Sequence, residues 1–144
     1  MPDDRYDISE DPARFDLAAI HAYLTRSYWA AGVPLGIVAR AIEHSLCFAV
    51  LHRADQVGFA RVVTDRATFA YLCDVYVLEA HRGRGLAKRM LHAIIAHPDL
   101  QGLRRFVLAT RDAHALYRRF GFTELQAPAR FMEIVKPDVY VQGR

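Results

Sequence analysis

The sequence has little cysteine, glycine and proline and no long apolar run, which excludes several classes of protein. Only Cys47 and Cys73 are present among its 144 residues, both in apolar segments, so we expect buried thiols in a reducing compartment and no disulfide framework. Eight glycines and six prolines argue against a fibrous or low-complexity chain. No run approaches the roughly 18 apolar residues of a membrane helix, and the first residues form no apolar leader, so we expect a cytoplasmic protein with no membrane partner.

Net charge and the spacing of the histidines and cysteines bear on whether the protein binds nucleic acid or a metal ion. The 19 lysines and arginines against 16 acidic residues give a formal net charge of +3, too small by itself to mark a nucleic-acid binder. The arginine pairs at 104–105 and 118–119 and a pI near 9.1 keep an RNA-binding domain as an alternative, but no aromatic RNA-recognition signature accompanies them. The seven histidines have no His-x-x-x-His spacing and the cysteines no Cys-x-x-Cys spacing, so we expect no metal site and no nucleic-acid partner.

Length and composition predict one globular domain over residues 1–144. Hydrophobic residues make up 53% of the chain and charged residues 24%, which is ordinary for a protein with a single core. No internal repeat is found, and no stretch rich in proline, glycine and serine separates two halves.

The periodicity of the apolar residues changes several times along the chain and predicts a mixed α/β fold. We expect four helices, two of them before the main strands, with Asp16 and Asp112 as N-caps of the first and last. We expect a central, mostly antiparallel sheet of six to seven strands. The helices are expected at residues 16–31, 34–44, 85–97 and 113–120, and the strands at 6–9, 46–51, 56–64, 68–77, 106–109, 122–125 and 131–135.

The residues that follow the strand at 68–77 have the character of an anion site. Gly83 and Gly85 let the backbone turn tightly before a helix, whose first turn presents unpaired amides and the positive end of its dipole. Arg82, Arg84 and Lys88 add positive charge at the same place, and arginine can hold a phosphate through two hydrogen bonds. The loop therefore predicts a pyrophosphate ligand.

Other phosphate motifs fit this loop less well. A P-loop needs Gly-x-x-x-x-Gly-Lys-Ser/Thr, and the dinucleotide fingerprint needs a third glycine where Lys88 stands. A tight strand-to-helix turn with solvated arginines is the purely structural alternative.

Two segments together resemble the GNAT acetyltransferase superfamily. The first matches its signature of Arg or Gln, two residues, Gly, one residue, then Gly or Ala, at Arg82, Gly85 and Ala87. The second is similar to the family's Ala-x-x-Leu-Tyr-x-x-x-Gly-Phe segment, at Ala113, Leu116, Tyr117, Gly121 and Phe122. The resemblance covers roughly residues 48–125, and the order of the elements agrees with the family over the whole chain.

The resemblance implies an acyl-CoA-dependent N-acyltransferase, whose sheet is splayed at the site of acetyl-CoA. Tyr117 is implied as the group that donates a proton to the departing thiolate. Thr110 stands where the family often has an asparagine near the cofactor, and this departs from the pattern. The implied cofactor-binding residues are Val75, Tyr76 and Val77 for the pantetheine arm and Arg82, Gly83, Arg84, Gly85, Leu86, Ala87 and Lys88 for the pyrophosphate.

Asp74 is a candidate base or a binding group for a cationic acceptor, because it is the only acidic residue in the strand at 68–77. Strand alternation would place Leu72, Asp74 and Tyr76 on one face. An ion pair between Asp74 and Arg61 is the equally weighted structural interpretation.

The acceptor is expected to be a primary amine, and aromatic residues near the element ends are the candidates for its pocket. Tyr28, Trp29 and Tyr71 are the main ones, and Phe131 and Met132 offer further apolar surface. A non-catalytic acyl-CoA sensor or interaction module is the alternative function. The late strands leave a homodimer possible, but nothing in the sequence selects it over a monomer.

Overall fold

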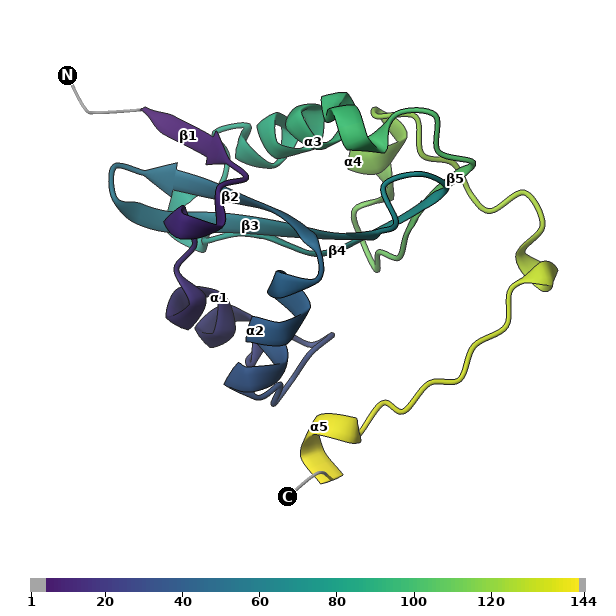
Figure 1. The fold of residues 1–144 in the computed structure, drawn as a ribbon, viewed down its shortest axis with the longest axis horizontal. Coiled ribbons are helices and arrows are strands. Elements are labelled where there is room, and N and C mark those ends of the chain that lie inside the picture. Colours follow the sequence, from purple (N-terminus) through teal and green to yellow (C-terminus); the bar gives the residue numbers. More distant parts are fainter. Residues whose placement is uncertain (1–4, 143–144) are drawn as a thin grey trace.

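The computed structural model describes residues 5–142 and contains one five-stranded sheet with the order β1-β2-β3-β4-β5 (Figure 1). The first four strands are antiparallel, and β5 is parallel to β4. The strands are β1 (Tyr6–Ser9), β2 (Leu46–His52), β3 (Asp55–Thr64), β4 (Phe69–Val77) and β5 (Arg105–Leu108). The predicted mixed α/β fold is confirmed, with fewer strands than the six to seven expected.

Helices cover both faces of the sheet (Figure 1). Two lie on one face and two on the other, and a last short helix returns to the first pair. The helices are α1 (Leu17–Leu24), α2 (Leu35–Glu43), α3 (Leu86–Ala96), α4 (His114–Arg118) and α5 (Val139–Gln142). Single 3-10 turns occur at Pro12–Arg14, Glu79–His81, Pro98–Leu100 and Pro128–Arg130.

Burial on both faces gives two hydrophobic clusters. Phe48 and Val50 of β2 face the cluster under α3, whereas Cys47 faces the cluster under α1 and α2. Because β2 lies between two strands and under two helix layers, its apolar residues run almost without interruption and are buried. At the start of α1, Asp16 accepts a hydrogen bond from the amide of Ala19 at 3.0 Å, as predicted for an N-cap.

A bulge in β4 breaks the alternation expected there. Phe59 of β3 pairs with Tyr76, but Arg61 pairs with Cys73, so β4 carries one extra residue, and Asp74 has a positive φ of 54°. Leu72 packs in the α3 cluster and Tyr76 in the α1–α2 cluster. The prediction that Leu72 and Tyr76 share a face was therefore wrong, because the extra residue reverses the side chains that follow it.

β4 and β5 pair over only four residues each and then separate. The ladder joins Phe69–Leu72 to Arg105–Leu108 and stops before the bulge. Beyond Leu72 the rest of β4 keeps only β3 as a partner, while the chain after β5 leads to α4. The sheet is thus open between these two segments, which is where the cleft described below lies.

The two last predicted strands were wrong. Residues 122–125 lie near β5 without joining its ladder, and residues 131–135 run through an extended stretch away from the body of the protein (Figure 1). Both segments have strand-like composition but no partner strand in the described chain. The cap predicted at Asp112 was also wrong: Thr110 Oγ1 accepts from the amide of Ala113, which is the N-cap residue of α4.

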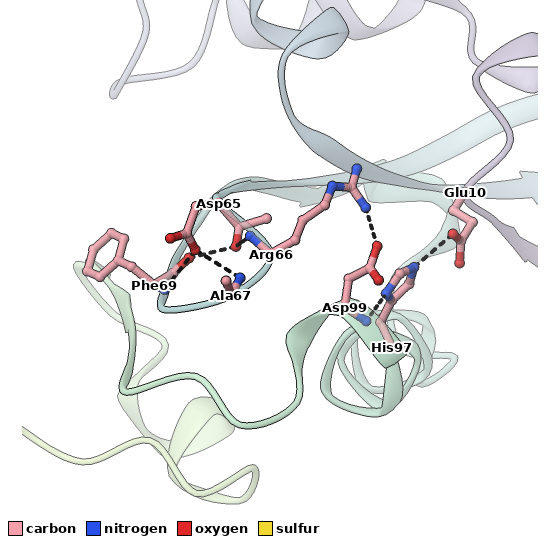
Figure 2. A network of polar contacts seen from close by, with 8 residues as sticks. Glu10, Asp65, Arg66, Ala67, Phe69, His97 and Asp99 are labelled. Atoms are coloured by element: carbon pink, nitrogen blue, oxygen red, sulfur yellow. Dashed lines mark hydrogen bonds and ion pairs between the residues drawn. The ribbon is translucent and has the colours of Figure 1, made fainter.

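A polar network joins the β3–β4 turn to the end of α3 (Figure 2). Arg66 of the turn pairs with Asp99, whose amide donates to Nδ1 of His97 at 3.0 Å. Because Nδ1 accepts, the ring proton is on Nε2, which donates to Glu10 at 2.8 Å. The network connects the segment after β1, the turn and the α3 end.

Asp65 fixes the β3–β4 turn. Its carboxylate accepts from the amides of Ala67, Thr68 and Phe69 and from the hydroxyl of Thr68. The hydroxyl and amide bonds from Thr68, followed by the other amides, hold the pKa of this carboxyl well below its usual range.

We expect Asp65→Ala to lower the thermal unfolding midpoint at pH 7, because three amides and a hydroxyl lose their acceptor. A depressed pKa gives stability that is present above the unfolded value of about 3.9 and is lost progressively as the pH falls from that value through the folded pKa. The difference from wild type should therefore shrink at about pH 2 in circular-dichroism melts, and Asp65→Asn, which keeps one acceptor oxygen, should lose less. An equal loss at both pH values would contradict this role.

Candidate functional site

The space between the diverging β4 and β5 segments is a cleft made of two connected cavities. One cavity of about 830 Å³ lies beside the end of β4 and the start of α3, and another of about 550 Å³ lies beside the bulge. Their shared lining residues are Tyr28, Trp29, Val75, Arg111, Asp112, Ala113 and Tyr117. The cleft is thus bounded by the α1–α2 connection, β4 and the start of α4.

The loop at one end of the cleft has the backbone conformation that its glycines suggest. Gly83 and Gly85 have φ values of 77° and 74°, and Gly85 is the N-cap residue of α3. No side chain caps this helix, so the amides of its first turn have no side-chain acceptor. An anion is the group that such a helix start accommodates.

Arg82 ties this loop to the strand and to α1. Its Nε donates to the carbonyl of Val77 at 2.9 Å, and a terminal nitrogen donates to the hydroxyl of Tyr23 at 3.3 Å. Tyr23 also stacks on Tyr76, with ring centroids 3.8 Å apart. Arg82 therefore sits at the mouth of the cleft in a fixed position, while Arg84 and Lys88 lie exposed nearby.

The predicted cofactor residues fall into three groups. Five line the larger cavity, and Thr110 lines the neighbouring one. Leu86 is buried in the α3 cluster and contributes packing. Gly83, Arg84, Gly85 and Lys88 form the exposed loop and first helical turn and are not among the residues that line the cavities. The five in the larger cavity are Val75, Tyr76, Val77, Arg82 and Ala87.

Tyr117 is buried where the two cavities meet. Only 8% of it is exposed, and its ring lies against Phe122 with an edge contact of 6.0 Å between centroids. Burial raises the pKa of this phenol above its ordinary value. The hydroxyl thus keeps its proton at neutral pH and can donate it.

Asp74 is held by two donors from different elements. Arg61 Nε donates to Oδ2 at 2.8 Å, and Trp29 Nε1 donates to Oδ1 at 2.9 Å. The alternative interpretation, an ion pair with Arg61, is confirmed, and both side chains are largely buried, with 20% and 11% exposed. A further cavity of about 250 Å³ lies on the α2 side of this group and is also lined by Tyr71.

Three of the five residues predicted for an acceptor pocket line the cavity beside the bulge, and two do not. Tyr28, Trp29 and Tyr71 all line the cavity beside the bulge. Phe131 and Met132 do not line it. Phe131 lies on the extended tail, where the Arg105 guanidinium is 5.0 Å from the centroid of the Phe131 ring.

Sequence reasoning missed two residues of the cleft. Arg111 lies over the ring of Tyr28 at 3.8 Å, and Tyr23 accepts from Arg82. Arg111 follows Thr110 directly, so its place after the splayed strand was a usable signal, but nothing in the α1 pattern distinguishes Tyr23 from a core residue.

The sequence comparison decides the family. The acetyltransferase (GNAT) domain matches residues 43–124, more than half of the chain. The chain belongs to the GNAT family. "Putative acetyltransferase FG08082" of Gibberella zeae is 34% identical over 135 residues, which cover 78% of this chain and 75% of that protein.

Solved structures agree with this GNAT assignment. The crystal structure of "a putative acetyltransferase belonging to the gnat family" from Xanthomonas campestris is 52% identical, with a TM-score of 0.93 over 97% of this chain and 98% of that chain. A "predicted acetyltransferase with acetyl-CoA" from Clostridium acetobutylicum has the same fold at 14% identity, with a TM-score of 0.65 over 91% and 95% of the two chains.

Residues 5–142 contain neither a metal-binding cluster nor a membrane-spanning helix. No cluster of three or more His, Cys, Asp or Glu side chains within these residues could hold a metal ion. None of the described helices has the length and apolar character needed to cross a membrane.

Burial raises the pKa of both thiols to about 12. Cys73 lines the cavity beside the bulge and Cys47 lies in the core under α1 and α2. A thiol with such a pKa is protonated at neutral pH and is a poor nucleophile. Covalent transfer through either cysteine is therefore disfavoured.

We expect the free energy of unfolding to fall as the pH rises from about 9 to 12. Over this range the unfolded chain releases the two thiol protons and the folded chain keeps them, at about 1.4 kcal/mol per pH unit for each thiol. Urea unfolding at pH 8 and 10.5 measures the slope, which should be shallower in Cys47→Ala/Cys73→Ala. Equal slopes in the two proteins would show that the thiols are not responsible.

Proposed function

We propose that this GNAT protein transfers the acetyl group of acetyl-CoA to a primary amine by direct attack. The observation that carries the proposal is the cleft between β4 and β5. The uncapped start of α3 lies at one end of it, and a buried, protonated Tyr117 lines the middle. An anion site and a proton donor in one cleft suit an acyl donor that carries a pyrophosphate and leaves as a thiolate.

The open sheet supplies the groups for the donor. Beyond Leu72, the cleft side of β4 has no β5 partner, so Val75 to Val77 can offer backbone hydrogen bonds to the amides of a pantetheine arm. The pyrophosphate would lie on the amides of the first turn of α3, with charge from Arg82, Arg84 and Lys88. Thr110 accepts from the amide of Ala113, the N-cap residue of α4, and so helps to position the helix that carries Tyr117.

The chemical step balances without a covalent enzyme intermediate. The bound ammonium first releases one proton to bulk water. The neutral amine nitrogen then attacks the thioester carbon, the new C–N bond forms and the C–S bond breaks. Tyr117 donates its proton to the departing sulfur, and the proton lost by the amine passes through water and restores the phenol. The protonated thiols of Cys47 and Cys73 support direct attack over transfer through an acyl-cysteine.

The acceptor would bind beside the bulge. Asp74 lies at the wall of this cavity with Tyr28, Trp29 and Tyr71 around it, and a carboxylate among aromatic faces favours a cationic amine. Both carboxylate oxygens already accept hydrogen bonds, so we assign Asp74 to holding and orienting the amine. Arg61 and Trp29 hold that carboxylate in place at the wall of the cavity.

We expect Tyr117→Phe to lower the release of CoA thiol from acetyl-CoA at least about tenfold, because a positioned acid commonly contributes about 100-fold to 10,000-fold. The assay follows the thiol across a panel of amines. Tyr6→Phe is the matched control, since this tyrosine is also 8% exposed but lies outside the cleft. Gly85→Glu should abolish donor binding, because it adds negative charge and a side chain at a positive φ.

The outcomes of this assay distinguish the acetyltransferase from the acyl-CoA sensor. Amine-dependent release that falls in Tyr117→Phe but not in Tyr6→Phe supports the enzyme and its proton donor. Tight binding of CoA without release on any amine supports the acyl-CoA sensor, and no binding of CoA overturns the proposal.

We expect Asp74→Asn to raise the KM for the amine acceptor at least about tenfold, with a smaller change in kcat, because the charge that attracts the amine is lost. Its thermal stability should also fall, since Arg61 loses its counter-charge in a largely buried place. Glu79→Gln is the control, because Glu79 is an exposed acid at the same cleft. A fall in kcat alone, with KM unchanged, would assign Asp74 to proton transfer.

A further inference from the structure

The cavity beside the bulge is lined by charges of both signs. Its charged lining residues are Asp74, Arg111 and Asp112. Asp74 belongs to β4, and the other two belong to the loop between β5 and α4. A cationic amine held at Asp74 would therefore share this cavity with a positive charge that repels it. An acceptor whose only charged group is an amine leaves Arg111 uncompensated.

The guanidinium of Arg111 is available to a ligand. It forms no ion pair and donates no hydrogen bond to any residue in the described range 5–142. It lies over the ring of Tyr28, with its central carbon 3.8 Å from the ring centroid. A guanidinium over an aromatic ring keeps its N–H groups at its edge, so this contact leaves the donors open to a planar anion.

A row of contacts joins Arg111 to Asp74. The rings of Tyr28 and Trp29 meet edge to face, with centroids 5.1 Å apart. Trp29 Nε1 in turn donates to Asp74 at 2.9 Å. Both aromatic residues line the same cavity. The α1–α2 connection thus holds a positive and a negative group at the two ends of one aromatic surface.

We propose that the acceptor is an amino acid, whose ammonium group binds at Asp74 and whose carboxylate binds Arg111. This inference rests on the acetyl transfer proposed above and names its acceptor class. The carboxylate offsets the charge that repels a plain amine, and it matches the guanidinium through two parallel hydrogen bonds. The amine reacts as described above, so the products are an N-acetyl amino acid and CoA.

The donor is a second source of an anion for Arg111, because this residue also lines the larger cavity. The start of α3, where the pyrophosphate is proposed to lie, has an arginine of its own in Arg82, which lines the larger cavity alone. Arg111 instead shares the smaller cavity with Asp74 and Tyr71. Its position therefore favours the acceptor, and the aromatic surface beside it favours an apolar side chain.

The substitution Arg111→Gln tests the assignment with acceptors that differ only in the carboxylate. The probes are L-leucine and L-phenylalanine, and the two amines that lack only their carboxylates. We expect the KM for each amino acid to rise at least about fivefold, because a bidentate pair is lost at a partly exposed place. The KM for each matching amine should not rise, and that for acetyl-CoA should stay within about twofold. Each acceptor is compared with itself in two proteins, so differences in amine basicity cancel.

Two further variants control for charge and position. Arg119→Gln should change none of these constants, because Arg119 is also exposed but lines neither cavity. Arg111→Lys keeps the charge without the planar fork and should retain part of the preference for amino acids. A rise in KM that is equal for an amino acid and its matching amine, or that is confined to acetyl-CoA, overturns the amino-acid acceptor and leaves acetyl transfer standing.

Calorimetric titration of the same amino acids, with CoA present, measures binding without turnover. Wild type should bind them at least about fivefold more tightly than Arg111→Gln does. If wild type binds neither amino acid, or binds both as tightly as the variant does, the inference is overturned. Binding that depends on Arg111, in a protein that acetylates no amine in the thiol-release assay, supports this site and contradicts acetyl transfer alone.

Discussion

The bulge at Asp74 is the constraint on which the cleft depends. One extra residue in β4 gives Asp74 a positive φ, and the side chain is held by Arg61 from β3 and Trp29 from the α1–α2 connection. An aspartate tolerates this conformation better than most residues, and two hydrogen bonds, one of them within the ion pair to Arg61, hold it there. The β4–β5 ladder ends just before this point, at Leu72.

On either side of the bulge, the side chains of β4 pack against different helix layers. Leu72 still faces the α3 cluster, but Tyr76 faces α1 and stacks on Tyr23, which in turn accepts from Arg82. The start of α3 is thereby tied to α1 across the end of β4. The loop that would bind phosphate is therefore placed by packing on the opposite face of the sheet, and its position depends on more than its own glycines.

Sequence reasoning found the local features and missed the ones that need a partner. Gly83 and Gly85 have the positive φ values expected of them, because the conformation of a turn is determined by the residues within it. The reversal at Asp74 could not be read from β4 alone, since it is fixed by Arg61 and Trp29, 13 and 45 residues away. Residues 131–135 have the composition of a strand, but a strand forms only where another strand receives it.

Burial raises the pKa of three titratable groups, with different consequences for a thiol and for a phenol. Burial raises the pKa of Tyr117 and of both thiols, and each of these groups is neutral at physiological pH. For a cysteine this removes the nucleophile, and for a phenol it keeps the proton on the oxygen, so the same desolvation disfavours covalent transfer and leaves Tyr117 protonated.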